Sequence, residues 1–170
     1  KFDKKFKFTE TKIKSNINLI KSKYKLDSLN LENYINNYNG FVELENHIID
    51  LELNKKGFSI KGKGKFIIDK KSDKIDYNVS FNNGNYNFKS AIQLKKNPLK
   101  LEILNYKKRE DDNSILNIEG AYNKNKSTNF KNILFEESKN KFFIKNLNLS
   151  NNFKIKDVAR LELDFINENK

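Results

Sequence analysis

The sequence predicts an all-β fold, a long antiparallel meander that forms a curved, open, groove-like sheet. Three observations lead to this fold class. Apolar and polar residues alternate along most of the chain, which is typical of strands with one apolar and one solvated face. Clusters of Asn, Asp and Gly, which tolerate the positive φ angles of hairpin turns, separate the alternating runs. Helical periodicity is nearly missing, so we expect at most one or two short helical segments.

Alternation is clearest in three central runs. From Phe58 to Ile68 the apolar residues and two glycines occupy even positions, while lysines occupy odd ones. From Ile75 to Phe81 the apolar residues take odd positions, and from Tyr86 to Leu94 they return to even ones. These runs supply the candidate binding face: Phe58, Ile60, Phe66, Ile75, Tyr77, Val79, Phe81, Tyr86, Phe88, Ile92 and Leu94.

Further strands are expected on both sides of the central runs, which brings the total to roughly a dozen. They are Phe2–Phe8, Ile13–Leu19, Phe41–Leu44, Ile48–Leu53, Leu99–Tyr106, Ile115–Tyr122, Phe130–Phe135, Phe142–Leu149 and Phe153–Phe165. The rhythm breaks once, at Leu26–Tyr38, where the spacing of Leu and Tyr fits a helical turn or irregular loop better than a strand. We interpret residues 1–170 as one β-rich segment of a larger chain, since the segment begins at Lys1 and contains no methionine. The break near 39–40 could separate two sections of the sheet.

The charge of the chain favours a solvated lysine face over a nucleic-acid interface. Lys and Arg number 34 against 22 Asp and Glu, but only Arg109 and Arg160 are arginines. Bidentate recognition of phosphate or guanine favours arginine, and the lysines here are spread evenly. We therefore expect no specific nucleic-acid partner. The chain has no cysteine, and no apolar run approaches the roughly 20 residues that span a bilayer.

Residues suited to catalysis are scarce. His47 is the single histidine, and it lies in Glu45-Asn46-His47, where the alternation changes parity, as it does at a β-bulge or a turn. Gly62 and Gly64 lie inside an alternating run, so we expect them to mark a bend or a close approach to the sheet. The acidic residues Glu110–Asp112 fit a solvated turn. We expect no catalytic residue, no metal and no cofactor, and a protein that is not an enzyme.

The apolar face must be covered in some way, and the sequence offers no amphipathic helix for this. The sheet could close on itself as a β-sandwich or barrel, which would suit a binding or adhesion module. It could instead stay open as a groove lined by apolar side chains. An uncovered apolar face of this size would be a binding surface, and lipid tails would satisfy it.

Two stretches resemble the AsmA-like superfamily, the repeating β-groove proteins of the cell envelope. One is Leu26–Ile35, which is similar to a short Leu-Asp, aromatic, Leu segment that recurs between sheet sections in that family. The other begins at Ile60–Phe66 with Asp76-Tyr77 and continues through Leu104–Tyr106, Ile118–Gly120 and Asp157–Asn167. These are similar to the domains of the larger AsmA-like proteins of Gram-negative bacteria, where such a strand leads into repeated hairpins.

The resemblance implies a periplasmic protein anchored to the inner membrane by a segment outside residues 1–170. Its groove would carry phospholipid acyl chains between the inner and outer membranes, in lipid transport or membrane biogenesis. The eleven residues of the candidate binding face would then be the lipid-facing ones. The family supplies no catalytic residues to transfer.

Overall fold

The computed structural model describes residues 12–26, 31–35, 38–102, 105–108, 110–123 and 127–165. The all-β prediction is confirmed. Nine antiparallel strands follow one another in chain order across a single sheet, and a two-stranded ribbon accompanies it. The expected strand Phe2–Phe8 lies outside the described residues.

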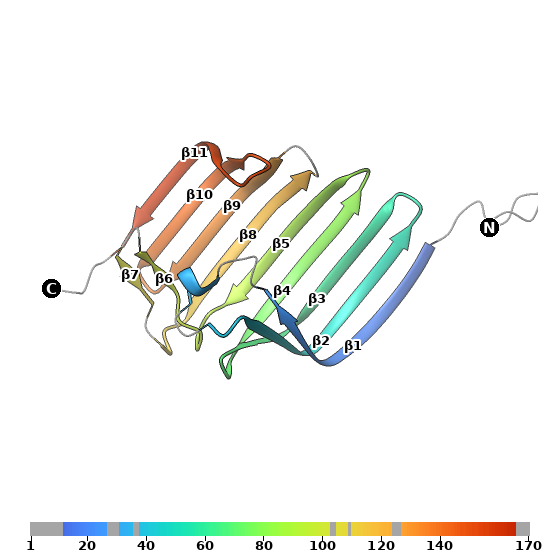
Figure 1. The fold of residues 1–170 in the computed structure, drawn as a ribbon, viewed down its shortest axis with the longest axis horizontal. Helices are drawn as coiled ribbons and strands as arrows, with labels where there is room; N and C mark the ends of the chain where they lie inside the picture. Colours follow the sequence, from blue (N-terminus) through green and yellow to red (C-terminus); the bar gives the residue numbers. More distant parts are fainter. Residues whose placement is uncertain are drawn as a thin grey trace, which may run out of the picture.

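The sheet is open at both edges (Figure 1). Its strands are β1 (Lys12–Lys25), β2 (Phe41–Asn54), β3 (Gly57–Ile68), β4 (Lys71–Asn82), β5 (Asn85–Gln93), β8 (Ser114–Asn123), β9 (Ser127–Glu137), β10 (Asn140–Leu149) and β11 (Ile155–Asp164). Strands β1 and β11 form the two edges and do not pair with each other, so the sheet is not closed into a barrel.

Two of the tight turns show why these residues form hairpins. Asp69 and Lys70, between β3 and β4, have φ angles of 47° and 65°. Asn83 and Gly84, between β4 and β5, have φ angles of 49° and 82°. Two successive residues with positive φ suit the right-handed twist of a hairpin, and Asn, Asp and Gly adopt that conformation at the least cost.

The expected strands Phe41–Leu44 and Ile48–Leu53 are one continuous strand, β2, interrupted by a bulge. The register with β3 shifts between Glu45 and Ile48, and Asn46 has a φ angle of 53°. The bulge predicted at Glu45–His47 is therefore confirmed, whereas the division into two strands was wrong. A bulge adds one residue and bends the strand, and β1 and β2 change direction sharply near one end of the sheet (Figure 1).

The expected strand Leu99–Tyr106 was wrong. Residues there form two strands of two residues each, β6 (Lys100–Leu101) and β7 (Tyr106–Lys107), which pair with each other outside the main sheet. Asn105, with a φ angle of 48°, reverses the chain between them. Within the predicted break at Leu26–Tyr38, a single turn of 3-10 helix spans Leu31–Asn33, in agreement with the sequence-based expectation.

Two long connections cover part of one face of the sheet, and we call their described parts, within residues 26–40 and 95–113, the cap. They meet where the Lys100 amide donates a 2.8 Å hydrogen bond to the Tyr34 carbonyl. Beneath them lies the buried core: Val42, Phe66, Ile68, Leu94 and Phe135. Leu31 and Tyr106 of the cap pack against this core. The cap thus closes one end of the strands on one face.

Because the strands alternate in direction, their connections fall into two sets. We call the side of the β2–β3, β4–β5, β8–β9 and β10–β11 connections the open rim, and the opposite side, which carries the cap, the capped rim (Figure 1).

Candidate functional site

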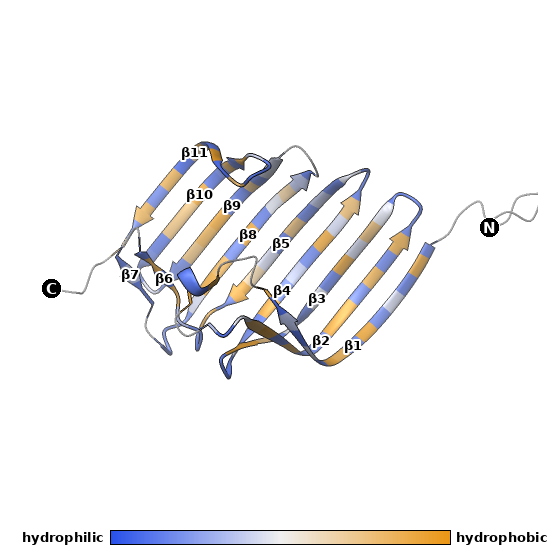
Figure 2. Ribbon diagram, in the orientation of Figure 1, coloured by the Kyte–Doolittle hydropathy of each residue, from blue (hydrophilic) through white to orange (hydrophobic). Residues whose placement is uncertain are grey.

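The strand register places ten of the eleven residues of the candidate binding face on one side of the sheet, and the eleventh, Leu94, directly follows β5 and belongs to the buried core. Residues directly opposite each other in an antiparallel pair share a face. Phe58 lies opposite Phe81, and Phe81 lies opposite Tyr86 on its other side. Val79 likewise lies between Ile60 and Phe88. The hydropathy of the strands alternates in bands that continue from strand to strand (Figure 2).

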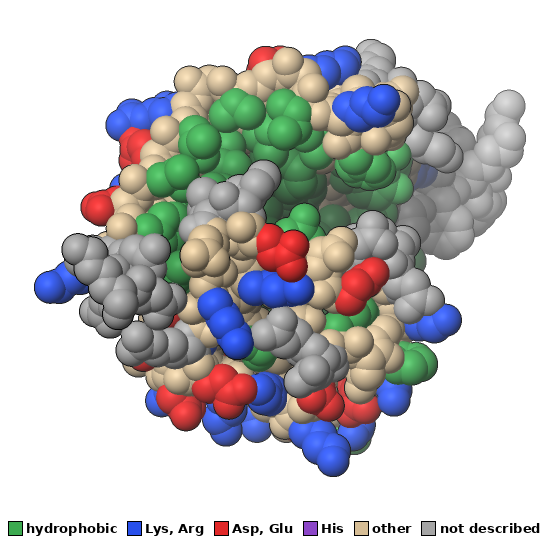
Figure 3. Space-filling model, turned by 60° about the vertical axis from the view of Figure 1, so that its left-hand side comes forward, with side chains coloured by type: hydrophobic (Ala, Val, Ile, Leu, Met, Phe, Trp, Pro, Cys, Tyr) green, Lys and Arg blue, Asp and Glu red, His purple; other side chains and the backbone are tan. Residues whose placement is uncertain are grey.

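The same face continues to both edges of the sheet. Ile17 of β1 pairs with Ile49 of β2, and Leu163 of β11 pairs with Phe142 of β10. The space-filling view shows hydrophobic side chains lining a hollow beneath the curved sheet, with the polar outer surface of the molecule below it (Figure 3). The apolar face is therefore the lining of a groove that runs across the strands.

The cap divides this groove lengthwise. Phe66 and Leu94 are buried in the core beneath the cap, and Ile75 and Ile92 pack against that core. The residues nearer the open rim are only partly buried: Phe58, Ile60, Tyr77, Val79, Phe81, Tyr86 and Phe88. Four of the eleven predicted residues thus serve the core, and seven line the uncovered half.

Aromatic rings form a ladder across the uncovered half, next to the open rim. Phe58 and Phe81 have ring centroids 5.7 Å apart, and Phe81 and Tyr86 have centroids 4.6 Å apart. Tyr122 extends the ladder onto β8, with its centroid 6.0 Å from that of Tyr86. Such pairs stabilise neighbouring strands by about 0.5–1.5 kcal/mol beyond their burial.

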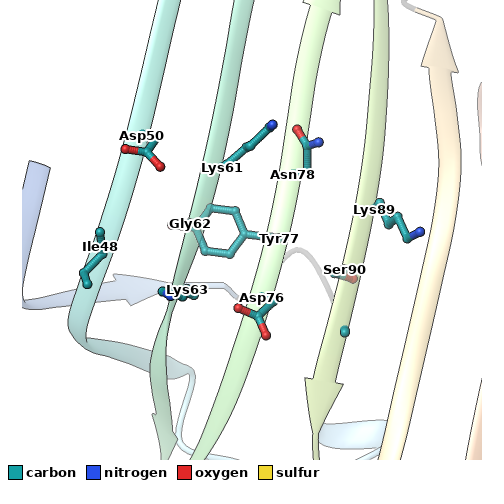
Figure 4. A pocket seen from close by; sticks show the side chains of 11 residues that line it. Ile48, Asp50, Lys61, Gly62, Lys63, Asp76, Tyr77, Asn78, Lys89 and Ser90 are labelled. Atoms are coloured by element: carbon teal, nitrogen blue, oxygen red, sulfur yellow. The ribbon is translucent and has the colours of Figure 1, made fainter. Parts of the chain in front are cut away.

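Glycines let two polar rings lie flat on the floor of the groove. The Tyr77 ring covers Gly62 (Figure 4). The imidazole of His47 covers Gly64, and each ring fills the place that a β-carbon would need. The prediction of a close approach at these glycines is confirmed. His47 is 1% exposed, and its Nε2 lies 2.8 Å from the Lys65 carbonyl oxygen. Its Nδ1 lies 3.4 Å from the Tyr77 hydroxyl. Because both ring nitrogens have hydrogen-bond partners within the sheet, we interpret His47 as a structural residue.

Sequence reasoning missed the polar groups that attach the cap. The buried carboxylate of Asp73 accepts hydrogen bonds from the backbone amides of Lys95, Lys96 and Asn97 and from the Asn97 side chain, at 2.8–3.1 Å. Asp73 occupies an apolar-face position of β4, in step with Ile75 and Tyr77. A carboxylate on an apolar face is costly to bury without hydrogen-bond donors. The position of Asp73 in the alternating pattern therefore indicated that its side chain has a specific partner.

A second group of polar side chains is buried where the cap meets β9. The Tyr106 hydroxyl donates a hydrogen bond to Glu137, and burial together with this bond raises the pKa of the phenol. The Lys108 ammonium donates a 3.0 Å hydrogen bond to the Lys95 carbonyl. Burial lowers the pKa of Lys108. These groups join the cap to the sheet.

The opposite face carries a shallow hollow of about 390 Å³, lined mainly by charged and polar side chains such as Lys61, Asp76 and Lys89 (Figure 4). Among the described residues, no three His, Asp or Glu side chains gather closely enough to hold a metal ion. No helix in the described ranges is long and apolar enough to cross a membrane. Comparison with protein-family models, with curated proteins and with solved structures finds no match.

Proposed function

We propose that the chain is a non-enzymatic segment of an AsmA-like protein, anchored to the inner membrane and facing the periplasm. Its apolar groove binds phospholipid acyl chains and supports phospholipid transport or outer-membrane assembly. The observation that carries this proposal is the uncovered half of the apolar face, which stays open along the open rim of a nine-stranded sheet.

The dimensions of the groove suit acyl chains. Nine strands spaced about 4.8 Å apart extend roughly 38 Å from β1 to β11. A bilayer core of about 30 Å holds two leaflets, so one extended acyl chain covers about 15 Å. Each buried methylene contributes about 0.8 kcal/mol. A groove of this length therefore accommodates whole acyl chains with a substantial gain in free energy.

The two edges of the sheet favour a role within a longer groove. Ile13 on β1 is 51% exposed, and Leu161 on β11 is 56% exposed, although both lie on the apolar face. Unpaired edge strands with apolar side chains promote aggregation unless another strand covers them. Further hairpins of a parent chain would pair with these edges and lengthen the groove.

The alternative prediction of a closed β-sandwich or barrel was wrong, because the nine strands form one open sheet. A binding or adhesion module of that kind would have buried Val79 and Phe88 on all sides. Instead these residues lie in the uncovered half of the groove.

Lipid binding is tested by incubating the purified chain with phospholipid vesicles, re-isolating it and measuring bound lipid by mass spectrometry. We expect bound phospholipid in the unchanged protein and much less in Val79→Arg, which places a charge in the path of the acyl chains. Lys89→Glu, on the opposite face, is the matched control and should bind lipid normally. A folded Val79→Arg protein that retains its lipid would contradict the proposal.

A further inference from the structure

We infer that the groove selects phospholipids with anionic headgroups and that these headgroups lie along the open rim. This inference rests on the proposed function and adds to it a class of lipid and a direction for the headgroup. It depends on the different charge of the two rims, on the position of the cap and on the aromatic ladder.

The described turns of the open rim carry lysine and amide side chains and no carboxylate. Lys55 and Lys56 are exposed in the β2–β3 turn, and Lys154 is exposed in the β10–β11 connection. Asn83 lies in the next turn along this rim, and Asn85 directly follows that turn. Ammonium and amide groups donate hydrogen bonds to phosphate oxygens, so these turns attract anions.

Two of these turns lie side by side. The backbone amide of Asn83 lies 3.5 Å from the carbonyl oxygen of Lys56. The β2–β3 turn is itself ordered by Asn54, whose side-chain oxygen accepts hydrogen bonds from the amides of Lys56 and Gly57 at 2.8 and 3.0 Å. The lysines and the neighbouring Asn side chains therefore belong to one ordered stretch of the rim.

The capped rim has a different charge. Its turns and connections contain the exposed carboxylates Asp69, Glu110, Asp111 and Asp112 alongside its lysines. Glu110 forms an ion pair with Lys71, which lowers the pKa of the carboxyl group. The carboxylate thereby offsets the positive charge of this lysine. Anionic headgroups would meet these carboxylates, and the cap blocks access to the groove from this side.

The aromatic ladder lies between the open rim and the acyl-chain region. Tyr86 and Tyr122 lie opposite each other, each the second residue from the end of its strand at this rim, and Tyr86 lies beside Phe81. Tyrosine favours the boundary between hydrocarbon and headgroups, because its ring is apolar and its hydroxyl is polar. A phospholipid that enters past the open rim would thus place its acyl chains against the ladder and its phosphate near Lys55 and Lys56.

The test compares extraction of dioleoylphosphatidylcholine and dioleoylphosphatidylglycerol from vesicles, because these lipids share acyl chains and differ in headgroup charge. We expect the unchanged protein to extract more phosphatidylglycerol. A lysine near an anionic surface contributes about 1 kcal/mol, which corresponds to about fivefold in binding. The double variant Lys55→Glu with Lys56→Glu should therefore lose at least about fivefold of this preference, while its extraction of phosphatidylcholine stays the same.

The matched control is Lys70→Glu with Lys139→Glu, which makes the same charge change in exposed turns of the capped rim. If this control variant still extracts more phosphatidylglycerol than phosphatidylcholine, the result supports the inference. Equal extraction of both lipids by the unchanged protein would overturn it, and so would an equal loss of preference in both double variants, which would indicate net charge alone. Failure to extract either lipid would overturn the proposed function as well, so the two failures are distinguishable.

Discussion

The ring of Tyr77 lies flat over Gly62, its direct partner across the β3–β4 pair, and occupies the space of a β-carbon. This contact brings the ring down onto the floor of the groove and places its hydroxyl beside His47. Phe88 covers Gly120 in a similar way across the β5–β8 pair. Glycine on the apolar face therefore makes the groove deeper where a large ring would otherwise project into it.

Substituting these glycines should destabilise the protein to different degrees. A β-carbon at Gly62 meets the far end of the Tyr77 ring, which can shift, whereas one at Gly120 meets the backbone carbonyl of Asn129. Overpacking costs about 1–3 kcal/mol, and we expect Gly62→Ala at the low end and Gly120→Ala at the high end of this range. Urea unfolding measures both.

The double variant Gly62→Ala with Tyr77→Ala serves as a control for the first glycine. Removing the ring should make the added methyl group harmless, so Gly62→Ala should cost less in the Tyr77→Ala background than alone. A stabilising effect of Gly120→Ala would show that β8 and β9 are further apart at this position than the structure indicates.

Asp73 should be essential for attachment of the cap. In Asp73→Asn one carboxylate oxygen is replaced by an NH2 donor, so some of the donors among the backbone amides of Lys95–Asn97 and the Asn97 side chain lose their acceptor. We expect a loss of about 2–3 kcal/mol in the free energy of unfolding. Hydrogen exchange at Lys95–Asn97 should also become faster. Asp76→Asn, an exposed position of the same strand, should change neither measurement.

The alternation of apolar and polar residues predicted the sheet well, because every second side chain of each strand lies on the same apolar face. The parity of Phe58–Ile68, Ile75–Phe81 and Tyr86–Leu94 placed eleven residues on one face, and the register agrees for the ten of them that lie in strands. The change of parity at Glu45–His47 likewise marked the bulge in β2. These features depend on local pattern and on neighbours in the chain.

The cap could not be predicted in the same way, because its contacts join residues that are distant in sequence. Leu99–Tyr106 alternates like a strand, yet Asn105 turns the chain and the ribbon packs over the groove. Asp73 reaches Asn97 only once this connection folds back onto the face. The division of the candidate face into a covered and an uncovered half follows from those contacts and not from periodicity.

Tyr106 should make the protein sensitive to alkali. Burial and the hydrogen bond to Glu137 raise the pKa of the phenol above its unfolded value of about 10. The folded state then keeps the proton at pH values where the unfolded chain loses it, so stability is fully present below about pH 10 and falls as the pH rises further. Urea unfolding at about pH 8, 10 and 11 measures this loss.

Tyr106→Phe should reduce the alkaline loss, because the titrating group is absent. It should also lower stability near neutral pH by about 1–3 kcal/mol, since Glu137 loses a hydrogen-bond donor within a buried site. Tyr34→Phe removes an exposed hydroxyl and is the matched control, so its pH dependence should follow that of the unchanged protein. An unchanged alkaline slope in Tyr106→Phe would place the sensitive group elsewhere.

Arginine substitutions at Ile92 and Val79 should separate the two halves of the groove. Ile92 packs against the core beneath the cap, so Ile92→Arg buries an unpaired charge and should cost about 3–5 kcal/mol. Val79 lies in the uncovered half, where the long side chain of arginine can extend toward the rim and keep its guanidinium in water. We expect Val79→Arg to cost only about 1 kcal/mol. Denaturant unfolding of both variants, with Ile92→Leu and Val79→Leu as size controls, gives the comparison. Losses of equal size would mean that the face is covered at both positions, which would remove the open groove on which the proposed lipid binding depends.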